Sequence, residues 1–161
     1  MQPAFKRALF ALTVIGAIFV VLPAQAFCFN EAGVRYKVDP LLLRSMATVE
    51  SNLNPRAVGM NRNKAGRVTS RDFGLMQINE RQIPQLRTLG IISSEQDLLT
   101  NACLNVQIGA WILAKHLQQC GVNWQCLGSY NAGFAENNGA RRMIYARKVY
   151  DMYLRLSGKA A

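Results

Sequence analysis

Histidine is almost absent from this chain of 161 residues, and the single one is His116. A metal site built on several imidazoles is therefore excluded. A Ser-His-Asp triad would have to use His116, which lies inside a helical pattern, so nucleophilic serine catalysis fits poorly. We expect neither a metal nor a cofactor.

Long apolar runs are also missing, except near the N-terminus. Residues 8–22 form an apolar run of 15 residues that follows Lys6 and Arg7 and precedes Ala24-Gln25-Ala26. This pattern predicts a secretory signal peptide over residues 1–26, followed by one exported domain over residues 27–161 in the periplasm. An uncleaved anchor is the alternative, although a membrane span needs about 20 residues. We expect no transmembrane segment after cleavage.

Acidic side chains are scarce. Residues 27–161 contain 17 basic and nine acidic side chains, a net charge of +8. An exported basic protein is expected to meet an anionic partner such as a cell-wall polymer or membrane head groups. Nucleic acid is not expected, because export removes the protein from the usual compartment of nucleic acids. A generally cationic, soluble surface is the alternative to a specific partner.

The chain has only four cysteines, Cys28, Cys103, Cys120 and Cys126. An even number in an exported chain indicates disulfides rather than a thiol nucleophile. Four cysteines allow three pairings. The short spacing and Gly121 favour a Cys120–Cys126 bond, which leaves Cys28 to pair with Cys103. The spacings do not resemble a structural zinc site.

Repeats and low-complexity segments are absent, and helical patterns dominate. Asp39-Pro40 is typical of a helix start, and we expect that helix to run to Glu50. Residues 56–79 contain three glycines and are typical of a loop with a two- or three-stranded hairpin. Further helices are expected from Ser94, over 103–119, over 123–130 and over 141–156. The sequence predicts a mostly helical α+β single domain.

Glu50 is the most informative residue. It follows Ala47, Met46 and Leu43 by three, four and seven positions, so its carboxyl shares the helix face that points to the core. Burial and the C-terminal end of a helix both raise the pKa of a carboxyl. A raised pKa suits a general acid near neutral pH. An exposed glutamate at a fraying helix end is the alternative.

Four short motifs occur around and after Glu50. They are Glu50-Ser51-Asn52-Leu53-Asn54, Asn61-Arg62-Asn63, Asp72-Phe73-Gly74-Leu75-Met76-Gln77-Ile78-Asn79 and Tyr130-Asn131-Ala132-Gly133. Together they resemble the lytic transglycosylases, in the soluble-lytic-transglycosylase branch of the lysozyme superfamily. The similarity spans residues 28–153 and is greatest to small single-domain members that accompany secretion, conjugation and pilus systems.

This resemblance implies a fold and a reaction. The fold would be lysozyme-like, with a helical body and a small β-hairpin region that flank a glycan groove. The reaction would cleave the β-1,4 bond between N-acetylmuramic acid and N-acetylglucosamine without water and form a 1,6-anhydro ring. Glu50 would act first as the acid and then as the base, with help from the acetamido group of the substrate. The protein would be a monomer that works with an envelope apparatus.

The resemblance also implies further residues of the sugar site. These are Ser51 beside the acid, Met76, Gln77 and Asn79 from the second long motif, Tyr130 and Asn131 as a wall, and Tyr145 on the last helix. Hydrogen bonds to sugar are expected from Gln77, apolar contact from Met76, and a hydrogen bond near the acid from Tyr145. Simple packing is the alternative for each residue.

Asp72 allows a second hypothesis about the reaction at this site. The segment around it also resembles animal-type lysozymes, in which the matching aspartate is the second catalytic carboxylate. Asp72 would then be a nucleophile or an electrostatic stabiliser, and the product would be hydrolytic. The structural alternative is a hairpin aspartate paired with Arg71 or Arg67. The competing hypothesis from a different functional class is a protein that binds the cell wall as a scaffold and has no catalytic activity.

Overall fold

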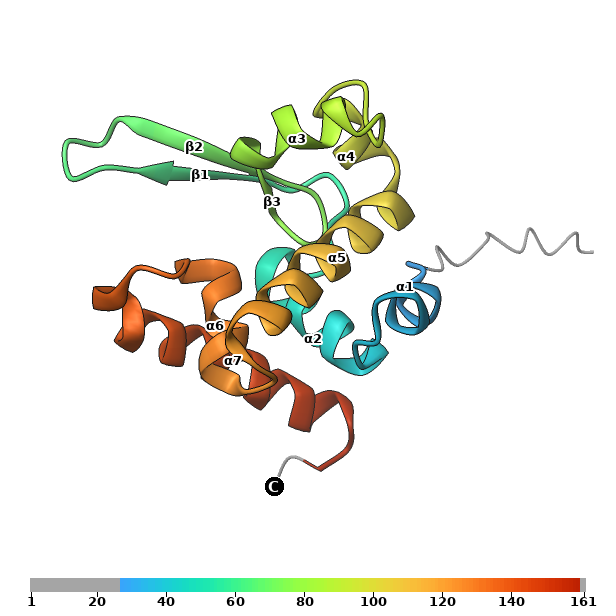
Figure 1. Ribbon diagram of the computed structural model, residues 1–161, viewed down its shortest axis with the longest axis vertical. Helices are drawn as coiled ribbons and strands as arrows, with labels where there is room; N and C mark the ends of the chain where they lie inside the picture. Colours follow the sequence, from blue (N-terminus) through green and yellow to red (C-terminus); the bar gives the residue numbers. More distant parts are fainter. Residues whose placement is uncertain (1–26, 160–161) are drawn as a thin grey trace, which may run out of the picture.

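Helices dominate the chain and surround a small antiparallel sheet in the order β1-β2-β3 (Figure 1). The structure is a computed structural model and describes residues 27–159. The predicted signal peptide, residues 1–26, lies outside the described residues. Among the described residues, no helix is both long enough and apolar enough to cross a membrane. The expected mostly helical α+β class is confirmed.

The elements follow one another in a simple order. The N-terminal half contains α1 (Phe29–Tyr36), α2 (Pro40–Ser51), β1 (Val58–Arg62), β2 (Val68–Phe73), β3 (Ile78–Asn79), the 3-10 turn η1 (Glu80–Gln82) and α3 (Ile83–Thr88). The C-terminal half contains α4 (Gln96–Thr100), α5 (Ala102–Cys120), α6 (Trp124–Ala132), the 3-10 turn η2 (Glu136–Asn138) and α7 (Gly139–Leu156).

Polar side chains begin three of the main helices. Asp39 Oδ1 accepts a hydrogen bond of 2.8 Å from the backbone N–H of Leu41, as expected for the start of α2. Asn101 and Asn123 cap α5 and α6 in the same way. The sequence did not predict α1 and α3, because each has at most eight residues and too few apolar positions to define a helical period.

The long helix α5 runs through the centre of the molecule, and the sheet lies with α3 and α4 above it in the view of Figure 1. It packs against α1, α4 and α6. Its side chains Val106, Ala110 and Leu113 are fully buried, as are Leu43 and Met46 of α2. The hydrophobic core therefore holds the end of α2 in a fixed position relative to the sheet.

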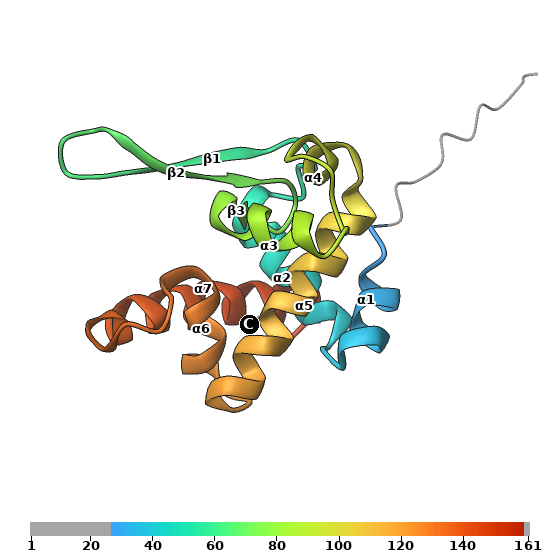
Figure 2. The ribbon, with the colours of Figure 1, turned by 45° about the horizontal axis from the view of Figure 1, so that its top comes forward.

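The sheet extends from this core as a long β1–β2 hairpin (Figure 2). In β1–β2, Asn61 is paired with Ser70 and Gly59 with Asp72, and in β2–β3 Asp72 is paired with Asn79. Alternate residues of a strand point to the same face, so Ser70 and Asp72 share one face. The expected hairpin is confirmed, with three strands.

A tight turn over residues 73–77 connects β2 to β3 and is held by Asn105 of α5. The buried Asn105 amide donates to the carbonyls of Phe73 at 2.8 Å and Leu98 at 3.0 Å. Its Oδ1 accepts a hydrogen bond of 2.8 Å from the backbone N–H of Met76. Gly74 has φ of 75°, and a Cβ at this position would collide with the Asn105 side chain. No sequence pattern marked Asn105.

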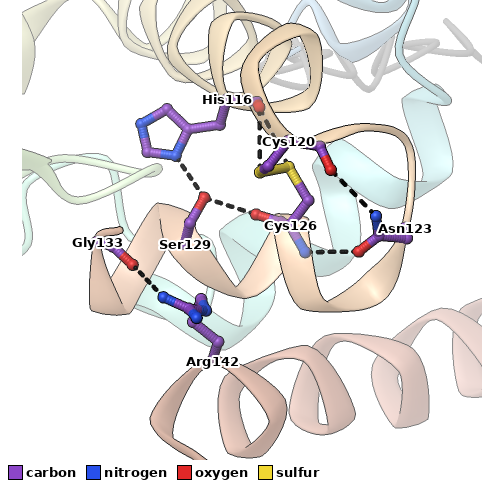
Figure 3. The surroundings of a disulfide bond; sticks show 7 residues. All are labelled: His116, Cys120, Asn123, Cys126, Ser129, Gly133 and Arg142. Atoms are coloured by element: carbon purple, nitrogen blue, oxygen red, sulfur yellow. Dashed lines mark hydrogen bonds between the residues drawn. A yellow bond between two sulfur atoms is a disulfide. The ribbon is translucent and has the colours of Figure 1, made fainter. Parts of the chain in front are cut away.

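Both expected disulfides form, Cys28–Cys103 and Cys120–Cys126. The second one joins the end of α5 to the first turn of α6 (Figure 3). Its two sulfurs lie 3.3 and 3.1 Å from the carbonyl oxygen of His116. Disulfide sulfurs carry no hydrogen, so these are packing contacts that fix the α5–α6 corner.

We predict that Asn105→Ala lowers the free energy of unfolding by about 3 kcal/mol, because it leaves one N–H and two carbonyls without partners in the core. Denaturant unfolding measures this change. Gln118→Ala on the same helix is the control, since Gln118 is exposed and should shift stability by less than about 0.5 kcal/mol. Equal stability of the Asn105 variant and the wild type would contradict the role of Asn105.

Candidate active site

Glu50 lies in the last turn of α2, with its carboxyl partly buried. The residues on its face of the helix, Leu43, Met46 and Ala47, are all fully buried. The expectation that Glu50 shares the core face is therefore confirmed. Tyr145 of α7 donates a hydrogen bond of 2.7 Å to Oε1 of Glu50, where the sequence predicted a contact near the acid.

The surroundings of Glu50 favour its protonated form. Burial raises the pKa of Glu50 to about 7, and the negative charge of Asp72 adds to this increase. The hydrogen bond from Tyr145 and the positive charge of Lys148 both lower the pKa of Glu50, and each has a smaller effect than burial. Burial also raises the pKa of Tyr145 well above its usual value, so its hydroxyl remains a donor. A carboxyl with a pKa near 7 can both give and take a proton near neutral pH.

A groove of about 560 Å³ passes over Glu50 between the sheet and the α5–α6 corner. The sheet side is lined by polar residues of the hairpin and β3, and the opposite side by α5, α6 and the loop after α6. The lining residues include Glu50, Asn61, Ser70, Asp72, Gln77, Asn79, His116, Ser129, Tyr130, Asn131 and Phe134. This volume lies within the usual range of ligand-binding clefts in proteins.

Asp72 lies on the sheet side of this groove, within a cluster of amides. Asn61 Nδ2 donates to Oδ2 of Asp72 at 2.7 Å, and Asn79 Nδ2 donates to Oδ1 at 2.6 Å. Both amides also contact the hydroxyl of Ser70, at 2.9 and 3.1 Å. The expected alternative, an ion pair of Asp72 with Arg67 or Arg71, is wrong, because the strand register brings the amides to the carboxylate instead.

The two carboxyls therefore have different surroundings in one groove. The Glu50 carboxyl is partly buried and accepts a hydrogen bond from one tyrosine hydroxyl, while Asp72 accepts hydrogen bonds from two side-chain amides. Amide donors stabilise an ionised carboxylate, whereas burial stabilises a protonated one. Such a pair can provide a proton donor and a fixed negative charge at the same time.

Three of the expected sugar contacts instead hold the 73–77 turn. Ser51 Oγ donates to the carbonyl of Leu75 at 2.9 Å, and the hydroxyl of Tyr130 donates to the carbonyl of Met76 at 2.9 Å. Gln77 Nε2 donates to the carbonyl of Gly74 at 2.9 Å. Tyr130 and Gln77 still line the groove, but their hydrogen bonds to the protein fix its floor.

The expected sugar contact of Met76 is contradicted. Its side chain is fully buried and packs on Gly109 of α5, where any added Cβ would collide with it. Met76 is therefore part of the core beneath the groove. Asn79 and Asn131 both line the groove, Asn79 on the sheet side and Asn131 at the end of α6. The Asn79 amide donates a hydrogen bond to Asp72, while the Asn131 side chain is exposed.

The sequence analysis missed an aromatic pair on the α5–α6 side of the groove. The rings of His116 and Phe134 have their centroids 4.6 Å apart, and both line the groove. Ser129 Oγ donates to the carbonyl of Cys126 at 2.6 Å, so it accepts from Nδ1 of His116 at 2.8 Å (Figure 3). Burial lowers the pKa of His116, which favours the neutral ring, and a neutral ring with its proton on Nδ1 has Nε2 as an acceptor.

The loop that carries Phe134 is fixed from α7. Arg142 donates to the carbonyls of Gly133 at 3.2 Å and Ala135 at 3.0 Å. Figure 3 shows the first of these bonds beside the disulfide corner. Among residues 27–159, no cluster of three His, Cys, Asp or Glu side chains could hold a metal ion.

This geometry of a buried acid beside a long polar groove agrees with the comparison to protein families. The sequence model described as "Transglycosylase SLT domain" matches residues 27–152. The chain belongs to the SLT transglycosylase family. The predicted membership among the peptidoglycan lytic transglycosylases is therefore confirmed.

Several curated relatives cover most of this SLT chain. "Peptidoglycan-binding-like protein" of Escherichia coli O157:H7 is 52% identical over 134 residues, which cover 83% of this chain and 80% of the relative. "Invasion protein IagB" of Salmonella typhimurium is 36% identical over 138 residues, which cover 86% and 82%. "Protein IpgF" of Shigella flexneri is 34% identical over 142 residues, which cover 88% and 89%.

A solved structure supports the SLT fold. It is an inactive mutant of the lytic transglycosylase Slt from Pseudomonas aeruginosa, with a TM-score of 0.58 and 16% identity. The match covers 86% of this chain and 25% of the Slt chain, so the present chain spans about a quarter of that enzyme. The predicted lysozyme-like transglycosylase fold is confirmed.

Proposed function

We propose that this protein cleaves the β-1,4 bond between N-acetylmuramic acid and N-acetylglucosamine in peptidoglycan and releases a 1,6-anhydromuramic product. One observation carries the proposal: a carboxyl with a pKa of about 7 lies in a groove of about 560 Å³. Such a carboxyl is protonated for a useful fraction of molecules at neutral pH, as a general acid must be.

Both proton transfers of the reaction need only Glu50 from the protein. The protonated carboxyl gives its proton to the glycosidic oxygen, and the bond from that oxygen to the anomeric carbon breaks. The acetamido oxygen of the muramic sugar stabilises the positive anomeric carbon. The ionised Glu50 then takes the proton of the C6 hydroxyl as O6 bonds to the anomeric carbon. No water enters, and Glu50 is protonated again at the end.

Tyr145 acts on Glu50 through a hydrogen bond. Its hydroxyl donates to Oε1 and fixes the carboxyl in one orientation, which leaves the other oxygen for the substrate. A donor stabilises the ionised form, so it helps Glu50 after the first proton transfer. Tyr145 is therefore a positioning residue in the proposed mechanism.

A lysozyme-type hydrolase is the second candidate, and Asp72 favours it. Its charge acts on Glu50 across the same groove, and its carboxylate oxygens accept hydrogen bonds from two side-chain amides. An ionised carboxylate near the anomeric carbon would stabilise its positive charge or bond to it, after which water would complete hydrolysis.

We also propose a place for the activity. The leader pattern of residues 1–26 and two disulfides suit the periplasm, where disulfides persist. One relative is named an invasion protein. Local opening of the wall for an envelope-spanning apparatus is consistent with that name and with the small size of the domain.

Product mass spectrometry on purified peptidoglycan tests the reaction. Wild-type protein is expected to release muropeptides that are one water lighter than the products of hydrolysis. Glu50→Gln should reduce cleavage by at least about 10³-fold, because one group performs both proton transfers and each is typically worth about 10²–10⁴-fold.

The Gln variant should retain the wild-type circular dichroism spectrum, since an amide fills the same space and can still accept from Tyr145. Products of hydrolysed mass would favour the lysozyme candidate. Wild-type cleavage by the folded variant would remove Glu50 from the mechanism, and no cleavage by either protein would favour a wall-binding scaffold.

Asp72→Asn tests the role of the second carboxyl. We predict a loss of about 10²-fold in the cleavage rate, the size expected when one preorganised electrostatic group is removed. The loss should be smaller than that of Glu50→Gln, because the acetamido group still assists. Initial rates of muropeptide release measure the effect.

The control for this variant is Asp151→Asn, which removes the same charge from an exposed position on α7. It should cleave at the wild-type rate. If Asp72→Asn instead lost stability but kept most of its activity, Asp72 would be a structural anchor of the sheet amides and not part of the chemistry.

A further inference from the structure

The groove does not end at Glu50. A second hollow of about 290 Å³, which we call the outer hollow, begins on the other side of this carboxyl and is lined by Val49, Glu50, Asn131, Arg141, Ile144, Tyr145 and Lys148. Glu50 and Asn131 line both spaces. The two spaces therefore adjoin each other at Glu50.

The outer hollow has a wall made of one face of α7. Arg141, Ile144, Tyr145 and Lys148 are spaced by three, four and seven positions, so they lie on one side of this helix. Two of the four are cations, one is an apolar side chain that is 60% exposed, and one is the tyrosine that holds Glu50.

Both cations lack a hydrogen bond or ion pair with other residues of the described part of the chain. Neighbouring cations differ: Arg142 is bound to two backbone carbonyls, and Lys115 Nζ lies 3.6 Å above the ring of Trp111. Lys148 acts on Glu50 through its charge alone. The outer hollow therefore presents two cations with free donors beside the acid.

We propose that the outer hollow is an anion subsite in which Arg141 and Lys148 bind a carboxylate of the peptide stem on the substrate. The inference rests on the proposed function, because it places the cleaved glycosidic bond at Glu50. The enzyme would then prefer strands with peptides whose carboxylates are free.

The chemistry of peptidoglycan points to the peptide stem. The glycan strand itself is uncharged, because the lactyl carboxyl of each muramic acid is joined to the peptide as an amide. The stem thus supplies the carboxylates nearest the cleaved bond. Its short alkyl groups suit the exposed Ile144, and its carboxylates suit an arginine fork and a lysine ammonium.

Glu50 itself does not oppose such binding below neutral pH. Its carboxyl is mostly protonated below a pKa of about 7, so it carries little negative charge toward the incoming carboxylate. Among the residues that line the outer hollow, Glu50 is the only one with a carboxyl group.

Binding to an inactive protein tests the subsite without cleavage. The Glu50→Gln protein is titrated by calorimetry with a peptide-bearing tetrasaccharide of peptidoglycan. It is also titrated with the same fragment after its carboxylates have been converted to amides. The test variant adds R141Q and K148Q, and the matched control adds R147Q and R155Q. Arg147 and Arg155 are exposed on α7 and line neither the groove nor the outer hollow.

We expect Glu50→Gln to bind the carboxylate form about tenfold more tightly than the amidated form, as one or two charge-assisted hydrogen bonds would give. This preference should disappear with R141Q and K148Q and persist with R147Q and R155Q. Thermal unfolding verifies that all variants are folded.

If both double substitutions abolish the preference for the carboxylate form, the preference comes from net charge. If both retain it, Arg141 and Lys148 do not bind the carboxylate. Either result overturns the subsite. Equal binding of the two fragments by Glu50→Gln would do the same. These outcomes are separate from the test of the proposed function, which depends on the amount and the mass of the products that wild-type and Glu50→Gln protein release from peptidoglycan.

Discussion

The turn over residues 73–77 is the constraint on which the rest of the site depends. Three helices hold it by its backbone: Asn105 of α5 binds Phe73 and Met76, Ser51 of α2 donates to Leu75, and Tyr130 of α6 donates to Met76. Because Ser51 directly follows Glu50, the bond that fixes the turn also fixes the end of the helix that carries the acid. The floor of the groove and the proton donor are thus positioned by one network.

The sheet adds a second carboxyl in a contrasting setting. Its register places Asn61 and Asn79 beside Asp72, while Glu50 is partly buried and accepts a hydrogen bond from Tyr145. A protonated acid and a nearby negative charge are therefore both built into one groove. The proposed anion subsite lies on α7, in the hollow that shares Glu50 and Asn131 with the groove.

Much of this architecture could be predicted from the sequence, because it depends on local rules. The spacing of Glu50 from Leu43 predicted its position on the core face, and the short loop around Gly121 predicted the Cys120–Cys126 bond. Roles that depend on tertiary contacts could not be predicted from local patterns, and the contact of Tyr145 with the acid was predicted only from the family resemblance. Met76 belongs to a motif but packs on Gly109, and Asn105 lies in an apolar helix with no local signal. His116, Phe134, Arg141 and Lys148 meet the groove only through the folded arrangement of α5, α6 and α7.

The central claim is that the fold keeps Glu50 protonated near neutral pH. Carbon-13 NMR of the glutamate side-chain carboxyls, with the Glu50 signal identified by its loss in Glu50→Gln, measures this property directly. The account predicts titration at about 7, as burial and the charge of Asp72 require. Since the acid must be protonated, cleavage should then decline as the pH rises through the same value. A Glu50 carboxyl that titrates near its ordinary value of 4.5 would contradict the account.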